Sequence, residues 1–134
     1  MKTNKRIIGD NGEELAASYL KNHRYKILER NFLVSGGELD IIAIETKKSR
    51  IIECNGIKIP KDFLNEDVLC FIEVKTRTSD SYGSPADAVD KLKQKNIVHA
   101  ASCYMFDKKV NKMQFRYDII EILDGKINHI KNAF

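Results

Sequence analysis

The spacing of apolar residues along the chain predicts a mixture of helices and strands. Residues 10–22 place Leu15, Ala16, Tyr19 and Leu20 at helical intervals, so this segment is predicted to be a helix. Short apolar runs and period-two alternation predict strands at 25–34, 37–45, 68–76 and 113–123, and a short last strand at 126–130.

A second helix is predicted between the strands at 68–76 and 113–123. It is expected to open with Ser84 as N-cap and Pro85 in the first turn, and to run to about Phe106. Its predicted apolar stripe consists of Val89, Leu92, Ile97, Ala100, Ala101 and Tyr104.

The long connection at 46–67 contains a hairpin signal, because Asn55 and Gly56 stand between two apolar runs. The predicted order is helix, three strands, helix and two strands, with this extra hairpin between the second and third strands. That order is typical of an α/β (mixed α+β) fold, in which helices flank one central mixed sheet. A chain of 134 residues fits a single domain, 1–134.

Charge and cysteine usage narrow the class of protein. The net charge of +4 and pI of about 8.9 are compatible with a phosphate-rich partner. The three cysteines form no CxxC pair, which argues against a disulfide framework or zinc site and favours a reducing cytosol, so a cytoplasmic protein is expected. No apolar run reaches membrane-spanning length, and the N-terminus lacks the apolar core of a signal peptide.

Basic residues gather in the second predicted helix and the segment after it. From Lys91 to Lys112 there are six lysines against one acid. Lys91 and Lys95 point away from the apolar stripe, which suits either phosphate contact or an ordinary solvated helix face. A second basic cluster consists of Lys21, Arg24, Lys26 and Arg30.

The stretch FIEVKTR, 71–77, carries charges where an apolar strand ends. Alternation puts Glu73, Lys75 and Arg77 on one face. Asp40 stands near the start of the preceding strand, and antiparallel neighbours bring the start of one strand against the end of the other. Asp40 is therefore expected to lie across from Glu73.

Two close carboxylates repel each other unless a cation lies between them. Mg²⁺ suits such a pair, because it takes oxygen ligands and retains several waters, and the main-chain carbonyl of Val74 would add a ligand. Such an ion lowers the pKa of a bound water and neutralises charge on a phosphate. Lys75 would orient the attacking water or stabilise the charge that develops on the phosphate.

Two further residues are expected at the same cleft. Glu13 flanks the apolar stripe of the first helix, whereas Glu14 falls on its solvent side, so Glu13 is a candidate ligand or water holder. Lys93 falls in the middle of the apolar stripe of the second helix, from which it would contact phosphate. Taken singly, Glu13 is also a helix-dipole acid, Lys93 a snorkelling lysine and the E-x-K pair a surface ion pair.

The order of several short motifs resembles a known family. These motifs are G-E-E-L-A-A-S-Y-L at 12–20, Y-K-I-L-E-R-N-F at 25–32, G-E-L-D-I-I at 37–42, F-I-E-V-K-T-R at 71–77, Y-G-S-P-A-D-A-V at 82–89, Lys93-Gln94 and R-Y-D-I-I at 116–120. Over nearly the whole chain they resemble the YraN family of small bacterial proteins. The D…E-x-K pattern resembles the PD-(D/E)XK nuclease superfamily, which has the restriction-endonuclease-like fold.

The resemblance implies roles for individual residues. Asp40 and Glu73 match the metal-binding acids, Lys75 the catalytic lysine, Glu13 the helical acid and Lys93 the lysine of the second helix. It implies a Mg²⁺-dependent nuclease, with Mn²⁺ as a substitute, that cuts DNA, with branched or damaged DNA as a candidate substrate. Lys93, Lys91, Lys95 and Arg77 are the expected nucleic-acid contacts, and a homodimer would cut two strands.

Two other functions remain open. The chain would also fit a non-catalytic nucleic-acid-binding or adaptor module on a nuclease-like scaffold, or a protein that binds a partner through the hairpin at 46–67. This connection is longer than the family pattern leads one to expect. The absence of Trp and of a clear aromatic platform disfavours base-specific recognition of single strands and leaves backbone-directed binding open.

Overall fold

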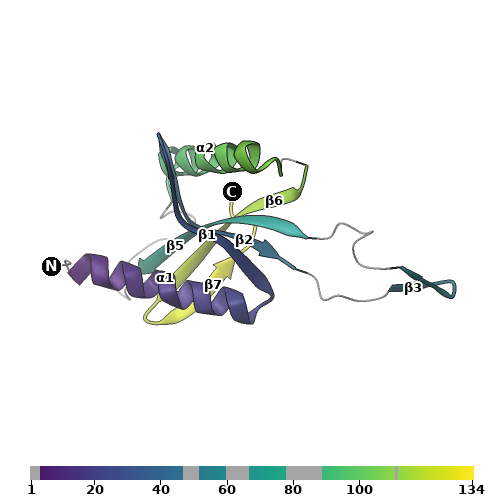
Figure 1. Ribbon diagram of the computed structural model, residues 1–134. Coiled ribbons are helices and arrows are strands. Elements are labelled where there is room, and N and C mark those ends of the chain that lie inside the picture. Colours follow the sequence, from purple (N-terminus) through teal and green to yellow (C-terminus); the bar gives the residue numbers. More distant parts are fainter. Residues whose placement is uncertain (1–3, 47–51, 60–66, 78–88, 111) are drawn as a thin grey trace.

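The computed structural model describes residues 4–46, 52–59, 67–77, 89–110 and 112–134. Its helices and strands follow the predicted order (Figure 1). They are α1 (Asn4–Asn22), β1 (Tyr25–Val34), β2 (Gly37–Glu45), β3 (Ile52–Cys54), β4 (Ile57–Ile59), β5 (Val68–Arg77), α2 (Lys91–Lys108), β6 (Gln114–Leu123) and β7 (Lys126–Ile130).

One mixed sheet organises the fold. Its strand order is β1-β2-β5-β6-β7, and β5 and β6 are parallel while the other neighbours are antiparallel. Helix α2 connects the parallel pair, and the hairpin β3–β4 forms a separate two-stranded sheet at the predicted Asn55-Gly56 turn. A central mixed sheet with one helix on each face is the restriction-endonuclease-like arrangement implied by the resemblance (Figure 1).

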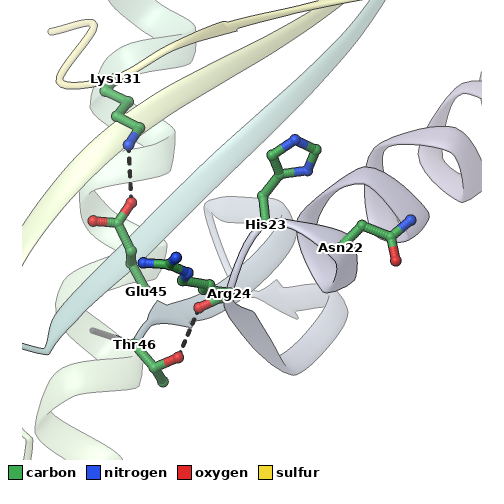
Figure 2. Close-up of a pocket in the computed structure, with 6 residues that line it drawn as sticks. All are labelled: Asn22, His23, Arg24, Glu45, Thr46 and Lys131. Carbon is green, nitrogen blue, oxygen red and sulfur yellow. Dashed lines mark hydrogen bonds and ion pairs between the residues drawn. The ribbon is translucent and has the colours of Figure 1, made fainter. Parts of the chain in front are cut away.

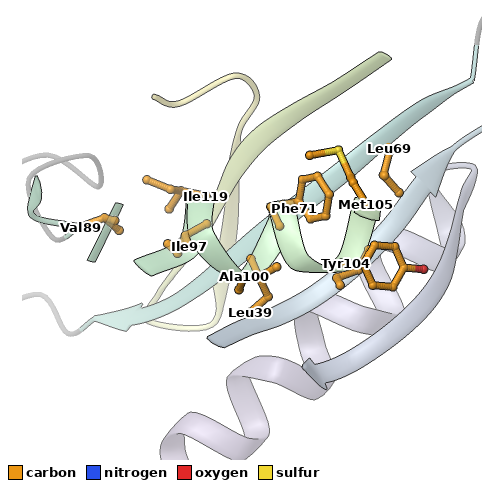
Figure 3. Packing of buried hydrophobic residues seen from close by; sticks show 11 residues of the cluster. Leu39, Leu69, Phe71, Val89, Ile97, Ala100, Tyr104, Met105 and Ile119 are labelled. Carbon is orange, nitrogen blue, oxygen red and sulfur yellow. The ribbon is translucent and has the colours of Figure 1, made fainter. Parts of the chain in front are cut away.

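Each face of the sheet has its own apolar core. Under α2, the core includes Phe71 of β5 and Ile97, Ala100 and Tyr104 of α2, several of which are drawn in Figure 3. Under α1, the corresponding cluster consists of Ala16, Leu20, Tyr25, Ile41, Ala43, Cys70, Ile72, Ile120 and Ile122. Strand β5 is the central strand, so its residues alternate between the two cores.

Helix α1 begins at Asn4, earlier than the predicted residue 10. The pair Asn11-Gly12 suggested a helix start, but Gly12 is buried inside the helix against β5. A Cβ on Gly12 would come within 2.1 Å of Thr76 Oγ1, so the glycine allows a close helix–strand approach.

Helix α2 begins at Lys91, later than predicted. Asp90 is the N-cap, because its carboxylate accepts the Lys93 backbone N–H at 2.8 Å. Ser84 and Pro85, the predicted cap and first turn, lie outside the described residues. The predicted stripe was wrong at Leu92, which is 68% exposed because it lies well round the helix from buried Ile97.

Along the β1–β2 hairpin, the side chains change which face of the sheet they point to. Asn31 has φ 53°, and on either side of it Arg30 pairs with Ile41 and Phe32 pairs with Leu39. Ile41 packs in the α1 core, but Leu39 packs in the α2 core. Strict strand alternation would put both residues on one face, so the face changes between them, opposite Asn31 in the left-handed region.

Gly37 sets how closely this hairpin approaches α2. A Cβ there would lie 2.4 Å from the backbone oxygen of Asn96. Gly37→Ala is therefore expected to lower the free energy of unfolding by about 1–3 kcal/mol through overpacking, measured by urea denaturation. Gly125→Ala is the control, because Gly125 has φ +79° but nothing within 4 Å of a built Cβ. An equal or smaller loss at Gly37 would contradict the steric explanation.

Candidate active site

The predicted acids meet where β2 and β5 separate. Their paired register runs from Glu45 and Val68 to Ile41 and Ile72, and the next positions are Asp40 and Glu73. At this point Asp40 Oδ2 accepts the backbone N–H of Val74 at 2.8 Å. The Asp40 carboxylate thus takes a contact just beyond the last strand pair, Ile41 and Ile72. The expectation that Asp40 lies across from Glu73 is confirmed.

Glu73 is a buried carboxyl group, with only 3% of the residue exposed. Burial, together with the charge of Asp40 and a hydrogen bond between the two side chains, raises the pKa of Glu73 to about 7, although Lys93 and Lys75 act in the opposite direction. Its Oε2 atom is buried and has no hydrogen-bond partner. Buried polar atoms are usually satisfied, so this oxygen is a candidate for a ligand contact.

Two ammonium groups flank the other oxygen of Glu73. Lys75 Nζ lies 3.5 Å from Glu73 Oε1, and Lys93 Nζ lies 3.4 Å from it. Lys93 also lies 3.4 Å from Glu38 Oε1. Burial alone would lower the pKa of Lys93, but the charges of Glu73 and Glu38 outweigh it and raise the pKa, which keeps the group cationic. Both lysines thus face the carboxylate as predicted.

These donors fit a hard divalent cation. Asp40 and Glu73 supply carboxylate oxygens, one of them the unsatisfied Oε2, and the Val74 carbonyl is a further candidate ligand. Among the described residues, no group of three or more His, Cys, Asp or Glu side chains gathers to hold a metal. Two carboxylates with vacant positions left to water and phosphate suit Mg²⁺ better than a soft metal.

Glu13 comes to this region from α1, a different element from those that carry the pair. Its helix, α1, packs on the opposite face of the sheet from Lys93, and Glu13 is half-buried beside Gly12, which touches Thr76. Among the described residues it does not join Asp40 and Glu73 in a three-carboxylate group. Glu14 is exposed, as predicted, and pairs with Arg30 at 2.7 Å. A role for Glu13 at the cleft remains a prediction.

The other basic residues differ in accessibility. Arg77 Nη1 lies 3.0 Å from Glu121 Oε1, and both side chains are about nine-tenths buried, which favours a structural ion pair. Lys91 and Lys95 are exposed on α2, as the helical spacing predicted. Of the four expected nucleic-acid contacts, Lys91, Lys93 and Lys95 have the accessibility that phosphate binding needs.

Glu73→Gln is expected to stabilise the fold at alkaline pH when divalent ions are absent. The pKa of Glu73 rises from 4.5 to about 7 on folding, so wild-type stability decreases as pH rises through this interval. The variant should therefore be more stable by about 2–3 kcal/mol at pH 8, with the gain shrinking toward pH 5. Thermal unfolding in EDTA at both pH values measures this difference.

Added Mg²⁺ should make the wild type more stable than Glu73→Gln at pH 8, since the ion binds only the wild-type carboxylate pair. Loss of stability in Glu73→Gln at pH 8 in EDTA would contradict the assignment of an unfavourable buried charge.

A buried polar network on the α1 face escaped the sequence reasoning. Asp118, fully buried, accepts hydrogen bonds from Arg116 Nε at 2.9 Å, His129 Nε2 at 2.8 Å and the Asn132 backbone N–H at 3.0 Å. Tyr19 of α1 lies 3.1 Å from the other ring nitrogen of His129. The network thus joins α1, β6, β7 and the C-terminal residues. An acid two residues after an arginine inside an apolar strand was the available signal.

Glu45 extends this network to an open pocket of about 440 Å³ (Figure 2). Burial would raise the pKa of Glu45, but hydrogen bonds from Tyr25, Arg116 and Lys131 outweigh it and lower the pKa to about 2. The pocket lies at the end of β2 opposite Asp40, beside the end of α1. The Glu45 carboxylate is thus already paired with protein groups, which favours a structural role for Glu45 over ligand binding in this pocket.

None of the described helices is both long and apolar enough to cross a membrane.

Comparison with known proteins places the chain in a family. Residues 12–122 match the uncharacterised protein family UPF0102. The chain is 40% identical to a UPF0102 protein of Caldanaerobacter subterraneus subsp. tengcongensis, over 99% of this chain and 98% of that protein. It is 37% identical to a UPF0102 protein of Clostridium perfringens (100% and 98% covered) and 38% identical to one of Geobacter metallireducens (100% and 97%). The chain therefore belongs to the UPF0102 family, the YraN family that its motifs resemble.

Proposed function

We propose that this protein is a Mg²⁺-dependent nuclease that hydrolyses phosphodiester bonds of DNA. The observation that carries the proposal is the buried Glu73 carboxylate, which faces Asp40 on one side and two ammonium groups on the other. The buried Glu73 Oε2 has no hydrogen-bond partner, which is uncommon for a buried polar atom and supports a ligand contact there. The site also lies at the end of the β2–β5 register, where the two strands separate.

Asp40, Glu73 and the Val74 carbonyl would hold the ion. A divalent ion bound there neutralises phosphate charge and makes a water molecule more acidic. The Val74 N–H fixes one oxygen of Asp40, which leaves the other oxygen to face the ion. Since Glu73 must lose its proton before it can act as a ligand, metal affinity should rise with pH up to about 7.

The two lysines act on the phosphate. Lys75 and Lys93 approach the same oxygen of Glu73, so a phosphate held beside this carboxylate would meet both ammonium groups. Lys75 orients the attacking water and donates to the charge that develops on the phosphate oxygens. Lys93 positions the substrate phosphate, and the exposed Lys91 and Lys95 extend the basic surface along α2.

A cleavage assay with an isosteric variant tests the proposal. Plasmid and branched DNA are incubated with Mg²⁺, with Mn²⁺ or with EDTA. Asp40→Asn should retain the acceptor for the Val74 N–H yet lose at least about a hundredfold in cleavage rate. Asp107→Asn is the control, because this acid is exposed near the end of α2.

Equal cleavage by wild type and Asp40→Asn would refute the nuclease proposal. Salt-dependent DNA binding without cleavage, weakened when Lys91 and Lys95 are neutralised, would instead support the binding-module alternative.

A further inference from the structure

A second cavity opens directly beside the candidate active site. It has a volume of about 280 Å³ and lies between the β1–β2 turn and the first turns of α2. The residues that matter for its chemistry are Leu33, Val34, Gly37, Glu38, Lys93 and Asn96.

Lys93 lines the cavity and also contacts Glu73 of the carboxylate pair. Its Nζ lies 3.4 Å from Glu73 Oε1 and 3.4 Å from Glu38 Oε1, and Glu38 is itself a wall of the cavity. A molecule in the cavity would therefore contact the ammonium group that faces Glu73. The cavity and the reaction centre are adjacent sections of one binding surface.

The walls combine apolar and polar groups. Leu33, which is 74% exposed, and Val34 supply the apolar part of the lining. Asn96 and Glu38 supply polar groups, among them the Glu38 carboxylate that faces Lys93. An apolar wall is poorly suited to a bare phosphate, and the charge of Glu38 repels one. A flat group with apolar faces and a polar edge suits these walls.

The size of the cavity limits its occupant. Pockets for drug-sized ligands measure roughly 300–1,000 Å³, so this cavity lies just below that range and suits one nucleobase with its sugar. A paired base is stacked inside a duplex and cannot enter such a cavity unless it leaves the stack. Gly37 keeps the β1–β2 turn close to Asn96, so the cavity has a defined floor.

We propose that this cavity holds one unpaired nucleobase of the strand whose phosphate lies at Asp40 and Glu73. The inference rests on the proposed nuclease function and specifies its substrate class: DNA that presents an unpaired nucleotide next to the scissile bond. Glu38 accepts a hydrogen bond from an exocyclic amino group, as carboxylates do from cytosine, and Leu33 packs on a face of the base.

Fluorescence anisotropy of labelled DNA tests the inference. The probes are a short duplex with one extrahelical cytosine and the same duplex fully paired, with Ca²⁺ in place of Mg²⁺ to prevent cleavage. Wild type should bind the first at least about tenfold more tightly. Leu33→Glu should reduce this preference, taken as the ratio of the two affinities within the variant, to about twofold or less, and Asn96→Ala should reduce it in the same direction.

Ile57→Glu is the matched control, because Ile57 is 66% exposed and lies in the separate β3–β4 sheet. It should keep the full preference. Equal binding of both duplexes by wild type, or full preference in Leu33→Glu, would overturn the inference. If both duplexes are cleaved at the same rate and cleavage depends on Asp40, the nuclease function stands but the nucleobase site does not. If the protein neither binds nor cleaves either duplex, the nuclease function and the nucleobase site are both overturned.

Discussion

Lys75→Met is expected to reduce the rate of Mg²⁺-dependent DNA cleavage by about a hundredfold or more, with little loss of metal affinity. Methionine preserves much of the apolar stem of the side chain while removing the ammonium group 3.5 Å from Glu73 Oε1. Without this group, the attacking water loses its orienting partner and the phosphate loses a donor. A nearby positive charge opposes cation binding, so the metal should bind at least as well as in wild type.

Single-turnover cleavage at saturating enzyme isolates the chemical step, and calorimetric titration with Mg²⁺ measures the affinity for the ion. Lys126→Met is the matched control, because Lys126 is an exposed lysine on β7, outside the basic surface of α2. A parallel loss of metal affinity and rate in Lys75→Met would indicate that the lysine assembles the site instead of acting in the reaction. A rate equal to that of wild type would remove Lys75 from the mechanism.

Asp118→Ala is expected to lower the free energy of unfolding by about 3–5 kcal/mol, the largest stability effect predicted for this chain. The substitution leaves the buried guanidinium of Arg116 and the ring of His129 without their shared acceptor. It also frees the Asn132 backbone N–H, which holds the C-terminal residues against β6. Urea denaturation followed by circular dichroism gives the loss, and Asp107→Ala provides an exposed acid for comparison.

The dependence of the unfolding free energy on pH in the acid range should also change in Asp118→Ala. Burial by itself would raise the pKa of Asp118, but hydrogen bonds from His129, Arg116 and the Asn132 N–H keep it below its usual range. The stabilisation is therefore present above the unfolded pKa and is lost as pH falls through the folded value. Asp118→Ala should show a shallower decline below pH 4 than wild type; an unchanged decline would contradict this role for Asp118.

Helices and strands with a regular spacing of apolar residues were predictable, because burial of those residues determines which face of the element points to the core. Lys93 stands four residues before Ile97, one helical turn from a fully buried side chain, so the face on which it lies followed from spacing. The meeting of Asp40 and Glu73 followed similarly from two apolar strands that share an antiparallel register.

Features that depend on one residue's backbone or on distant partners were not predictable. The change of face between Ile41 and Leu39, opposite the left-handed Asn31, leaves no trace in the apolar pattern. The Asp90 cap of α2 was not predicted, because aspartate is common at many positions before a helix and the capping contact depends on local backbone geometry. Asp118 drew no interpretation, since its partner His129 comes from another strand and Tyr19 from a helix 110 residues away from that histidine.

The pairing of Glu45 with Val68 anchors the two ends of the long β2–β5 connection. Five residues of strand separate Glu45 from Asp40, or about 16 Å at the rise of a β-strand. The connection therefore joins the sheet at the end of β2 and β5 that lies away from the two carboxylates. The same separation makes the Asn55-Gly56 turn a suitable place to graft a fluorophore or an epitope for following the protein in cells.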